Sequence, residues 1–385
     1  MNKTYCSALF NHIYSDNSDN YSLCCHASKK HVPRVNASEV TPFEWFLGDH
    51  MEEFRDKVIA GEKLPACEKC YKIEEAGHES QRLKRFRSDK NISFEPEKIE
   101  LKLRIFGNYC NLSCYTCHPY NSSTREKELK EIGIYENYAY DETEKAPSKN
   151  QYEKIAQDVL DNIHLVGKIL FTGGEPLLLP RHHDFIDKIS DADAQNIKVS
   201  YMTNFTELNH KGVYFLDKVR RFKGANFCIS CDHYGDKLSY IRYPIDVYKF
   251  EKNLEILAEE HVKTNGFMDG AIHLTASILN IEDIYDIRNY YQSKFGLKLK
   301  VASIVRSPYD FCVTNHPRKD YLIEKYKHDK NLNTLLFHLK RPSNVTYWNN
   351  AIKYFESLDA HRGTNFRKLW PEYDYIDTID HKFIG

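Results

Sequence analysis

Residues 100–305 alternate short apolar runs with longer segments of helical periodicity, and this alternation limits the folds open to the chain. The apolar runs predict strands and the segments between them predict helices. Six strands are expected, at 100–106, 168–172, 197–204, 225–232, 271–279 and 297–305. Helices are expected near 151–165, 181–190, 211–222, 247–261 and 282–296. Such an order predicts an α/β fold with a parallel sheet, right-handed crossovers and strands buried on both faces.

Size and charge exclude several classes of protein. The 385 residues suffice for one large domain and a smaller one. With 54 basic and 55 acidic residues the chain is nearly neutral, so no overall field recruits nucleic acid or a membrane surface. Residues 1–19 lack the apolar run of a signal peptide, and no segment is long enough to span a bilayer. The eleven cysteines lie in short clusters, which favours metal-bound thiolates in a reducing cytoplasm over a disulfide framework.

Three cysteines follow the first predicted strand directly. A Gly-Asn pair at 107–108 ends the strand, and Cys110, Cys114 and Cys117 come next with the spacing C-x3-C-x2-C. Three thiolates on one loop can hold three corners of a metal site and leave the fourth open, whereas a structural zinc site is normally closed. An iron–sulfur cubane with one unligated iron uses such an open corner. The alternative is a zinc site that His118 completes as a fourth ligand.

The cysteine loop resembles the cluster loop of radical S-adenosylmethionine (SAM) enzymes. The aromatic residue that this family places directly before the last cysteine is displaced, because Tyr115 lies one position early and Thr116 takes its place. The resemblance implies a [4Fe–4S] cluster on the three cysteines, with SAM bound at the free iron. It implies reductive cleavage of SAM to a 5′-deoxyadenosyl radical that abstracts a hydrogen atom from a substrate. The fold that it implies is a partial (β/α)6 TIM-type barrel.

Polar or glycine-rich residues follow each predicted strand, at the end where ligands bind in α/β proteins. Gly173, Gly174 and Glu175, followed by Pro176, come after the second strand and match the family's GGEP motif. Glycine lets a backbone approach a ligand without an intervening Cβ atom. In the family this motif engages the amino group of SAM, and Glu175 could act by its charge or by fixing the turn.

Further candidate SAM contacts lie at later strand ends. Ser230 ends the fourth predicted strand and Arg242 follows twelve residues later, a layout similar to the residues that bind the SAM carboxylate in peptide-modifying members. A guanidinium fork matches the two oxygens of a carboxylate. The alternative for Arg242 is a surface ion pair. Asn204 and Asn280 are predicted to contact the ribose or the backbone.

A second set of cysteines precedes the predicted barrel. Cys67 and Cys70 have the C-x2-C spacing that lets two sulfurs reach one metal, and Cys6 and Cys24 could complete the site. Cys25 is an alternate ligand or a bystander. The set resembles the twitch (half-SPASM) auxiliary-cluster module of radical SAM enzymes, although that module normally follows the barrel. A structural zinc knuckle is the alternative, because ligand type alone does not separate the metals.

The predicted domains are a twitch-like module at 1–95, a radical SAM partial barrel at 96–306 and a C-terminal helical cap at 307–385. In the module, Trp45, Phe46, Met51 and Phe54 have the spacing of a helix, and the basic run 81–87 predicts a solvated linker helix. A polar insert covers 118–150, and cap helices are expected near 320–340 and 346–359.

The remaining cysteines are not predicted ligands. Cys228 and Cys231 lie on one predicted strand and point to opposite faces, so buried thiols are expected. For Cys312 a core thiol is preferred over a hydrogen-atom donor or an extra cluster ligand.

The resemblance also bears on substrate and partners. It favours a peptide or protein side chain as substrate, with an auxiliary iron–sulfur cluster that accepts the electron left on the product, orients the substrate or braces the fold. A small molecule such as a sugar or nucleoside, and a tRNA base, are alternatives, as is a zinc-stabilised binding protein without catalysis. A flavodoxin- or ferredoxin-type electron donor is expected and a membrane partner is not; nucleic acid is not favoured. No residue spacing singles out a catalytic acid or base.

Overall fold

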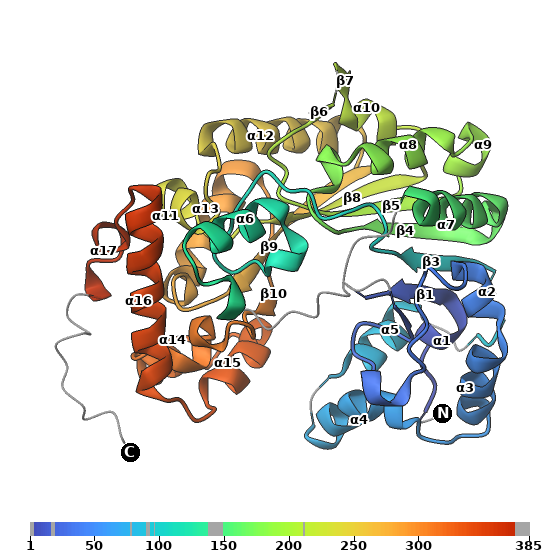
Figure 1. The fold of residues 1–385 in the computed structure, drawn as a ribbon, viewed down its shortest axis with the longest axis horizontal. Coiled ribbons are helices and arrows are strands. Elements are labelled where there is room, and N and C mark those ends of the chain that lie inside the picture. Colours follow the sequence, from blue (N-terminus) through green and yellow to red (C-terminus); the bar gives the residue numbers. More distant parts are fainter. Residues whose placement is uncertain are drawn as a thin grey trace. The chain divides into compact units, whose positions relative to one another are not determined.

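The computed structural model describes residues 4–16, 20–77, 79–89, 93–95, 97–137, 149–210 and 212–373 (Figure 1). The described residues fall into two compact units. The first unit lies within Met1–Asn108, Asp141–Met202 and Asn209–Asn226. The second lies within Tyr109–Tyr140, Thr203–Leu208 and Phe227–Gly385. These units do not follow the three predicted domains, whose boundaries remain a prediction.

The first unit contains a mainly parallel sheet. Strands β3 (Ile99–Lys102), β4 (Val166–Phe171) and β5 (Lys198–Thr203) pair in parallel in that order. They correspond to the first three predicted strands. Strand β1 (His12–Ser15) pairs in parallel with β3, and β2 (Tyr21–Ser22) pairs antiparallel with β1. The sequence did not predict β1 and β2, because runs of four and two residues are too short to show a period.

Helices pack against apolar residues of this sheet. Helix α7 (Lys149–Asp161) precedes β4, and α8 (Pro180–Lys188) precedes the short α9 (Asp191–Ala194). Phe171 of β4 packs against Phe185 of α8, with ring centroids 6.2 Å apart. Both rings are buried, so these contacts form the core of the first unit.

The helix predicted at 211–222 is wrong over its first part. The structure has a hairpin there, β6 (Asn209–His210) with β7 (Val213–Tyr214), followed by the short helix α10 (Phe215–Val219). Gly212 has a φ of 82°, which suits a turn and not a helix.

The described residues of the first unit before β3 form five α-helices. They are α1 (Ala8–Asn11), α2 (Pro42–Leu47), α3 (Asp49–Ile59), α4 (Glu68–Glu75) and α5 (Gln81–Asp89). The single helix expected around Trp45–Phe54 is two helices, divided at Gly48, where a Cβ atom would lie 2.8 Å from the Glu44 carbonyl oxygen. The basic run does form a helix, but its description as solvated is wrong. Arg82 is buried, paired with Glu74, and donates to the Tyr5 carbonyl oxygen at 3.0 Å.

The second unit contains the remaining predicted strands. They are β8 (Gly224–Ser230), of which residues from Phe227 belong to this unit, β9 (Met268–Ala276) and β10 (Leu299–Ile304), in that order. Strands β9 and β10 are parallel. Helices α12 (Val247–Lys263) and α13 (Ile284–Phe295) follow β8 and β9 as predicted, and α11 (Gly235–Ile241) was not predicted.

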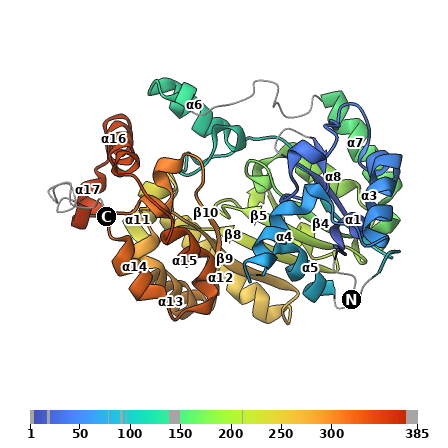
Figure 2. The ribbon, with the colours of Figure 1, turned by 90° about the horizontal axis from the view of Figure 1, so that it is seen from below.

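Helices from the insert and the C-terminal region complete the second unit. The insert forms α6 (Ser123–Glu131), and its residues 138–148 lie outside the described residues. The helix expected at 320–340 is two helices, α14 (Lys319–Tyr326) and α15 (Asn333–Leu339), which lie side by side in both views (Figures 1 and 2). Helix α16 (Val345–Arg362) confirms the prediction at 346–359 and precedes α17 (Phe366–Leu369).

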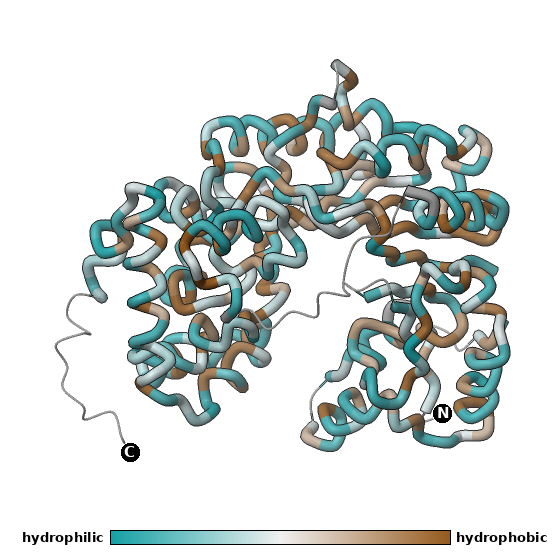
Figure 3. The backbone as a smooth tube through the Cα atoms, in the orientation of Figure 1, coloured by the Kyte–Doolittle hydropathy of each residue, from teal (hydrophilic) through white to brown (hydrophobic). Residues whose placement is uncertain are grey.

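The fold class is therefore a mostly parallel α/β sheet with helices, as predicted. Hydrophobic and hydrophilic stretches alternate along the helices (Figure 3), as in helices with one buried face. Among the described residues, no helix has both the length and the apolar character that crossing a membrane requires.

Candidate functional site

The cysteine loop is the first part of the candidate site and belongs to the second unit. Cys114 is buried, while Cys110 and Cys117 are half-buried. The loop backbone is fixed by the end of α11 and the residues after it, because the Ser113 N–H donates to the Tyr243 carbonyl at 2.6 Å. The Tyr115 N–H likewise donates to a carbonyl of this segment. The three predicted ligands thus lie on one braced loop.

Two side chains donate N–H groups to the loop sulfurs. Asn204 Nδ2 lies 3.7 Å from Cys110 Sγ, and Arg242 Nη1 lies 3.8 Å from Cys114 Sγ. Burial raises the pKa of the Cys114 thiol, and the charge of Arg242 opposes this rise. Hydrogen bonds to sulfur and nearby positive charge stabilise a thiolate, and they are means by which proteins set the potential of iron–sulfur clusters. Thiolates with such N–H donors are the type of ligand that iron–sulfur clusters use.

Asn204 joins the segment after β5 to the cysteine loop. Its Nδ2 donates to Asn111 Oδ1 at 2.9 Å, and its Oδ1 accepts from the N–H and the hydroxyl of Thr206 at 3.0 and 2.8 Å. These bonds orient the amide so that an N–H faces Cys110. The structure thus gives Asn204 a role toward the loop, and its predicted contact with SAM remains a prediction.

Arg242 forms a buried ion pair, so the alternative of a surface ion pair is wrong. Its Nη2 lies 2.7 Å from Asp232 Oδ2, and Asp232 Oδ1 accepts from the Thr275 N–H at 2.8 Å. Burial alone would lower the pKa of Arg242, but the charge of Asp232, together with the nearby Cys114 and Cys231, outweighs it and the pKa is raised. Its Nε is buried with no hydrogen-bond partner among the described residues. Binding of the SAM carboxylate by Arg242 remains a prediction.

Ser230 lies at the end of β8, whereas Asn280 follows β9 in the chain but lies beyond its end at Ala276, because β9 is shorter at this end than the predicted strand 271–279. Ser230 is half-buried and is the last residue of its strand. Asn280 is buried and holds the turn after β9, because its Nδ2 donates to the Thr275 carbonyl at 3.0 Å and its Oδ1 accepts from the Ser277 N–H at 2.9 Å. Asn280 thus fixes this turn, and its predicted contact with SAM remains a prediction.

Tyr115, the displaced aromatic residue of the loop, belongs to the core of the second unit. Its hydroxyl donates to Ser277 Oγ at 2.5 Å, and its ring lies 5.2 Å from that of Phe311 and 5.3 Å from that of Phe355. The side chain is fully buried. It anchors the cysteine loop by packing, which is a role different from a contact to adenine.

The GGEP segment follows β4 in the first unit, and backbone geometry explains its first glycine. Gly173 has a φ of 142°, and a Cβ atom there would lie 2.8 Å from the Gly107 carbonyl oxygen. The Gly174 N–H donates to the same oxygen at 3.1 Å. Glu175 is buried, and its carboxylate accepts from the Leu177 N–H at 3.1 Å. Of the two roles considered for Glu175, the structure shows the fixing of the turn.

The N-terminal cysteines come together in the first unit. Burial raises the pKa of Cys24 to about 12, and the nearby Cys6, Cys25 and Cys70 contribute. Burial raises the pKa of Cys67 as well, with contributions from Cys6, Cys24 and Cys70. The four predicted ligands are therefore close enough to influence one another, and the His26 N–H donates to Cys24 Sγ at 3.4 Å.

The side chains of the described residues do not form a ready metal site. No group of three or more His, Cys, Asp or Glu among the described residues is placed to hold a metal ion. Metal ligation by the two cysteine sets therefore remains a prediction based on spacing and proximity. The sets are Cys110, Cys114 and Cys117, and Cys6, Cys24, Cys67 and Cys70.

The other thiols and His118 have local partners. The Cys231 thiol donates to the His233 carbonyl oxygen at 3.1 Å. The thiol is buried, and burial raises its pKa to about 12. Cys228 is half-buried on the alternating strand β8. Cys312 is buried, as expected if it is a core thiol, and its Sγ lies 3.3 Å from Thr314 Oγ1. His118 Nδ1 accepts from the Tyr120 N–H at 3.3 Å.

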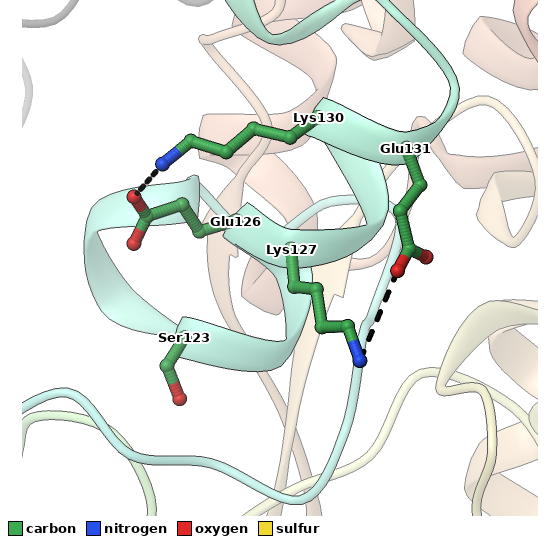
Figure 4. Close-up of a pocket in the computed structure, with 5 residues that line it drawn as sticks. All are labelled: Ser123, Glu126, Lys127, Lys130 and Glu131. Atoms are coloured by element: carbon green, nitrogen blue, oxygen red, sulfur yellow. Dashed lines mark hydrogen bonds and ion pairs between the residues drawn. The ribbon is translucent and has the colours of Figure 1, made fainter.

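A pocket on α6 contributes no chemistry to the site. It is lined by Ser123, Glu126, Lys127, Lys130 and Glu131 (Figure 4). Lys130 pairs with Glu126 at 2.6 Å and Lys127 with Glu131 at 3.8 Å, so the charges neutralise each other along a single helix. This is the pattern of a solvated helix face.

Sequence reasoning missed Asp232, Glu128 and Arg362, which contact the loop or its neighbours. Asp232 is the last residue of the predicted strand 225–232, so its position was a usable signal. Arg362 had no such signal, because it donates to the Ser113 carbonyl across 249 residues of sequence.

A comparison with family models matches part of the chain. The Radical SAM superfamily model matches residues 105–283, which include the cysteine loop, the GGEP segment and Arg242. This part of the chain is therefore similar to a radical SAM domain. Radical SAM enzymes use a [4Fe–4S] cluster and SAM as cofactors. No curated protein matches the chain.

Several solved structures are similar at low identity. Native anSMEcpe with bound AdoMet and Cp18Cys peptide is 17% identical, with a TM-score of 0.36, and the match covers 59% of each chain. SuiB of Streptococcus suis bound to S-adenosylmethionine is 14% identical, with a TM-score of 0.37 and coverage of 79% of this chain and 62% of SuiB. TYW1 with a lysine-pyruvate adduct bound is 15% identical, with a TM-score of 0.32 and coverage of 57% and 70%. The chain thus spans about three fifths of the length of anSMEcpe.

Proposed function

We propose that the protein reductively cleaves SAM and uses the resulting 5′-deoxyadenosyl radical to abstract a hydrogen atom from a peptide or protein side chain. The observation that carries this proposal is the braced C-x3-C-x2-C loop within the part of the chain that is similar to a radical SAM domain, with N–H donors directed at two of its three sulfurs. The cluster held there would supply the electron that cleaves SAM.

In this proposal Cys110, Cys114 and Cys117 hold the cluster. Asn204 and Arg242 each donate an N–H to a sulfur, which disperses negative charge and shifts the potential. Arg242 keeps a positive charge near Cys114, and Asp232 fixes the direction of its guanidinium. These residues orient the site and do not themselves react.

The proposed SAM contacts are the residues at the strand ends. Gly173, Gly174 and Glu175 present backbone after β4, and the glycines keep that segment free of Cβ atoms. Arg242 has one buried donor, Nε, that could turn to a carboxylate. The full set is Gly173, Gly174, Glu175, Asn204, Ser230, Arg242 and Asn280.

We infer an auxiliary iron–sulfur cluster on Cys6, Cys24, Cys67 and Cys70. The mutual influence of these thiols and the N–H donated to Cys24 support a common site. The resemblance of this cysteine set to the twitch module also favours a peptide or protein substrate. A cytoplasmic location and a flavodoxin- or ferredoxin-type donor fit oxygen-sensitive thiolate chemistry, and both belong to the proposal.

The test is anaerobic purification and reconstitution, followed by iron analysis and detection of 5′-deoxyadenosine after reduction in the presence of SAM. The wild type is expected to be brown and to form 5′-deoxyadenosine. A variant with Cys110, Cys114 and Cys117 changed to Ala should form none, whereas the Cys228→Ala control, a half-buried thiol outside the loop, should behave as the wild type. A colourless protein with stoichiometric zinc and no 5′-deoxyadenosine would contradict the proposal.

A substrate test can follow on the same preparation. Reaction with a peptide pool and with tRNA, each followed by mass spectrometry, would separate the substrate classes. Loss of two hydrogen masses or a cross-link in a peptide supports the proposal, and modification confined to tRNA contradicts its substrate class.

A further inference from the structure

Arg362, the last residue of α16, contacts the cysteine loop from a distant part of the sequence. Its side chain is fully buried. Nε and Nη2 donate to the two oxygens of Glu128 at 2.6 and 2.8 Å, and Nη2 also donates to the Ser113 carbonyl at 2.6 Å. Nη1 lies 3.3 Å from the Tyr240 carbonyl. A bidentate fork of this kind fixes direction as well as distance.

Ser113, which directly precedes Cys114, has each of its polar groups bonded. Its N–H donates to Tyr243, its carbonyl accepts from Arg362, and its hydroxyl donates to Glu128. The peptide plane between Ser113 and Cys114 is therefore held through its carbonyl, and the plane before it is held through the Ser113 N–H. Rotation of the first of these planes would move the Cys114 side chain, so these bonds set its position.

A second arginine extends the network to the other side of Cys114. Arg125 is fully buried, binds Glu128 at 2.5 Å and donates to the Tyr115 carbonyl at 3.3 Å. Two buried guanidinium groups against one carboxylate leave a net positive charge beside the loop. A buried ion triad is weak evidence of stabilisation for its own sake, because apolar residues often replace one without loss. A positive charge does complement a loop whose thiolates are negative.

We propose that Arg362 and Glu128 are positioning residues that hold the Ser113 peptide so that Cys114 presents its sulfur in the direction needed for cluster binding. This inference rests on the proposed function for the identity of the bound group. The C-terminal helix α16 is thereby a part of the cluster site, although its sequence carries no ligand.

The test compares the full-length wild type with Arg362→Gln in two measurements. The first is the rate at which iodoacetamide alkylates Cys114 in the iron-free protein, followed by mass spectrometry. Arg362→Gln should raise this rate about tenfold, because a charged hydrogen bond changes a local opening equilibrium by at least that factor. The second is the SAM concentration that changes the electron paramagnetic resonance spectrum of the reduced protein, which should rise by a similar factor.

Arg367→Gln is the matched control. Arg367 lies on α17, is partly exposed and pairs with Glu356 at 3.1 Å, so its loss should leave both measurements unchanged. Arg362→Lys keeps the charge but not the fork, and it should show both changes to a smaller extent. If Arg362→Gln does not fold, the alkylation rate and the SAM response of Arg362→Lys decide whether the inference holds.

The outcomes separate positioning from stability and from the proposed function. The inference is overturned if Arg362→Gln lowers the melting temperature but leaves the alkylation rate of Cys114 and the SAM response at wild-type values. It is also overturned if every folded Arg362 variant has wild-type values in both measurements. If the wild type binds no iron, the proposed function fails. The alkylation rate of Cys114 still tests the positioning of the loop in that case.

Discussion

Replacement of Gly173 by alanine tests whether the first glycine of GGEP is required by the fold. The φ of 142° lies in a region that is almost exclusive to glycine, where other residues cost about 1–3 kcal/mol. The added Cβ atom would also lie 2.8 Å from the Gly107 carbonyl oxygen, which must then move. That movement weakens the hydrogen bond from the Gly174 N–H, a loss of about 0.5–1.5 kcal/mol. The expected cost is therefore about 2–4 kcal/mol of the free energy of unfolding.

Gly61→Ala is the matched control for Gly173→Ala. Gly61 lies in the same unit and has a positive φ of 85°, but a Cβ atom there would meet no atom within 4 Å. It should cost only the left-handed strain, about 1 kcal/mol. Urea unfolding gives both values, and hydrogen exchange over 166–171 reports the local effect at β4. Equal costs for the two variants would refute the reasoning and leave a ligand as the reason for Gly173.

Three other changes probe the site and its surroundings. Asp232→Asn leaves Arg242 buried without its carboxylate and should lower the free energy of unfolding by about 3–5 kcal/mol; a loss under about 1 kcal/mol in urea would contradict this. Burial lowers the pKa of His12 to about 3, below its ordinary value of 6.5. Below pH 6.5 the unfolded state therefore binds a proton that the folded state does not, and the free energy of unfolding falls as the pH drops. Between pH 7.5 and 5 this loss is about 2 kcal/mol, and His12→Gln should remove it; identical pH profiles in urea would argue against this assignment. Cys67→Ser should lower the iron content without abolishing the spectral response to SAM, and unchanged iron would exclude Cys67 as a ligand.

The long strand–helix repeats could be predicted from the sequence because each has a clear period. The runs that became β4, β5, β8, β9 and β10 are apolar and five or more residues long, so they are distinct from their surroundings. Short elements lack this signal. Strand β1 has only four residues, and its pairing with β3 depends on partners almost ninety residues away. Local pattern carries no information on such a contact.

Helix boundaries failed where one residue decided them. The helix expected through Trp45–Phe54 breaks at Gly48, and the apolar spacing continues across the break. The capping box formed by Thr41 and Glu44 marks the start of α2, and it was present in the sequence. The end of that helix needs the close approach of Gly48 to the Glu44 carbonyl, which only the structure shows.

The candidate site likewise has parts that the sequence predicts and parts that it does not. Cysteine spacing and GGEP are local patterns, so the loop and the turn could be predicted from the sequence alone. The side chains that set the properties of the loop are not local: Asn204 and Arg242 were singled out as SAM contacts, but each donates an N–H to a sulfur of the loop. A residue's type and strand position predict that it faces the site, and they do not predict which group in the site it binds.

The buried pair of Arg242 and Asp232 bears directly on how SAM could bind. In this guanidinium Nη2 is paired with Asp232 at 2.7 Å and Nη1 faces Cys114, whereas Nε has no hydrogen-bond partner among the described residues. Either the SAM carboxylate shares Arg242 through Nε, or Arg242 serves the sulfur alone. The two cases differ in Arg242→Lys, which keeps a charge near Cys114 but has no second donor in the plane of the fork. If Arg242 binds SAM, this variant should weaken SAM binding more than it shifts the cluster potential, and if it serves the sulfur the order should reverse.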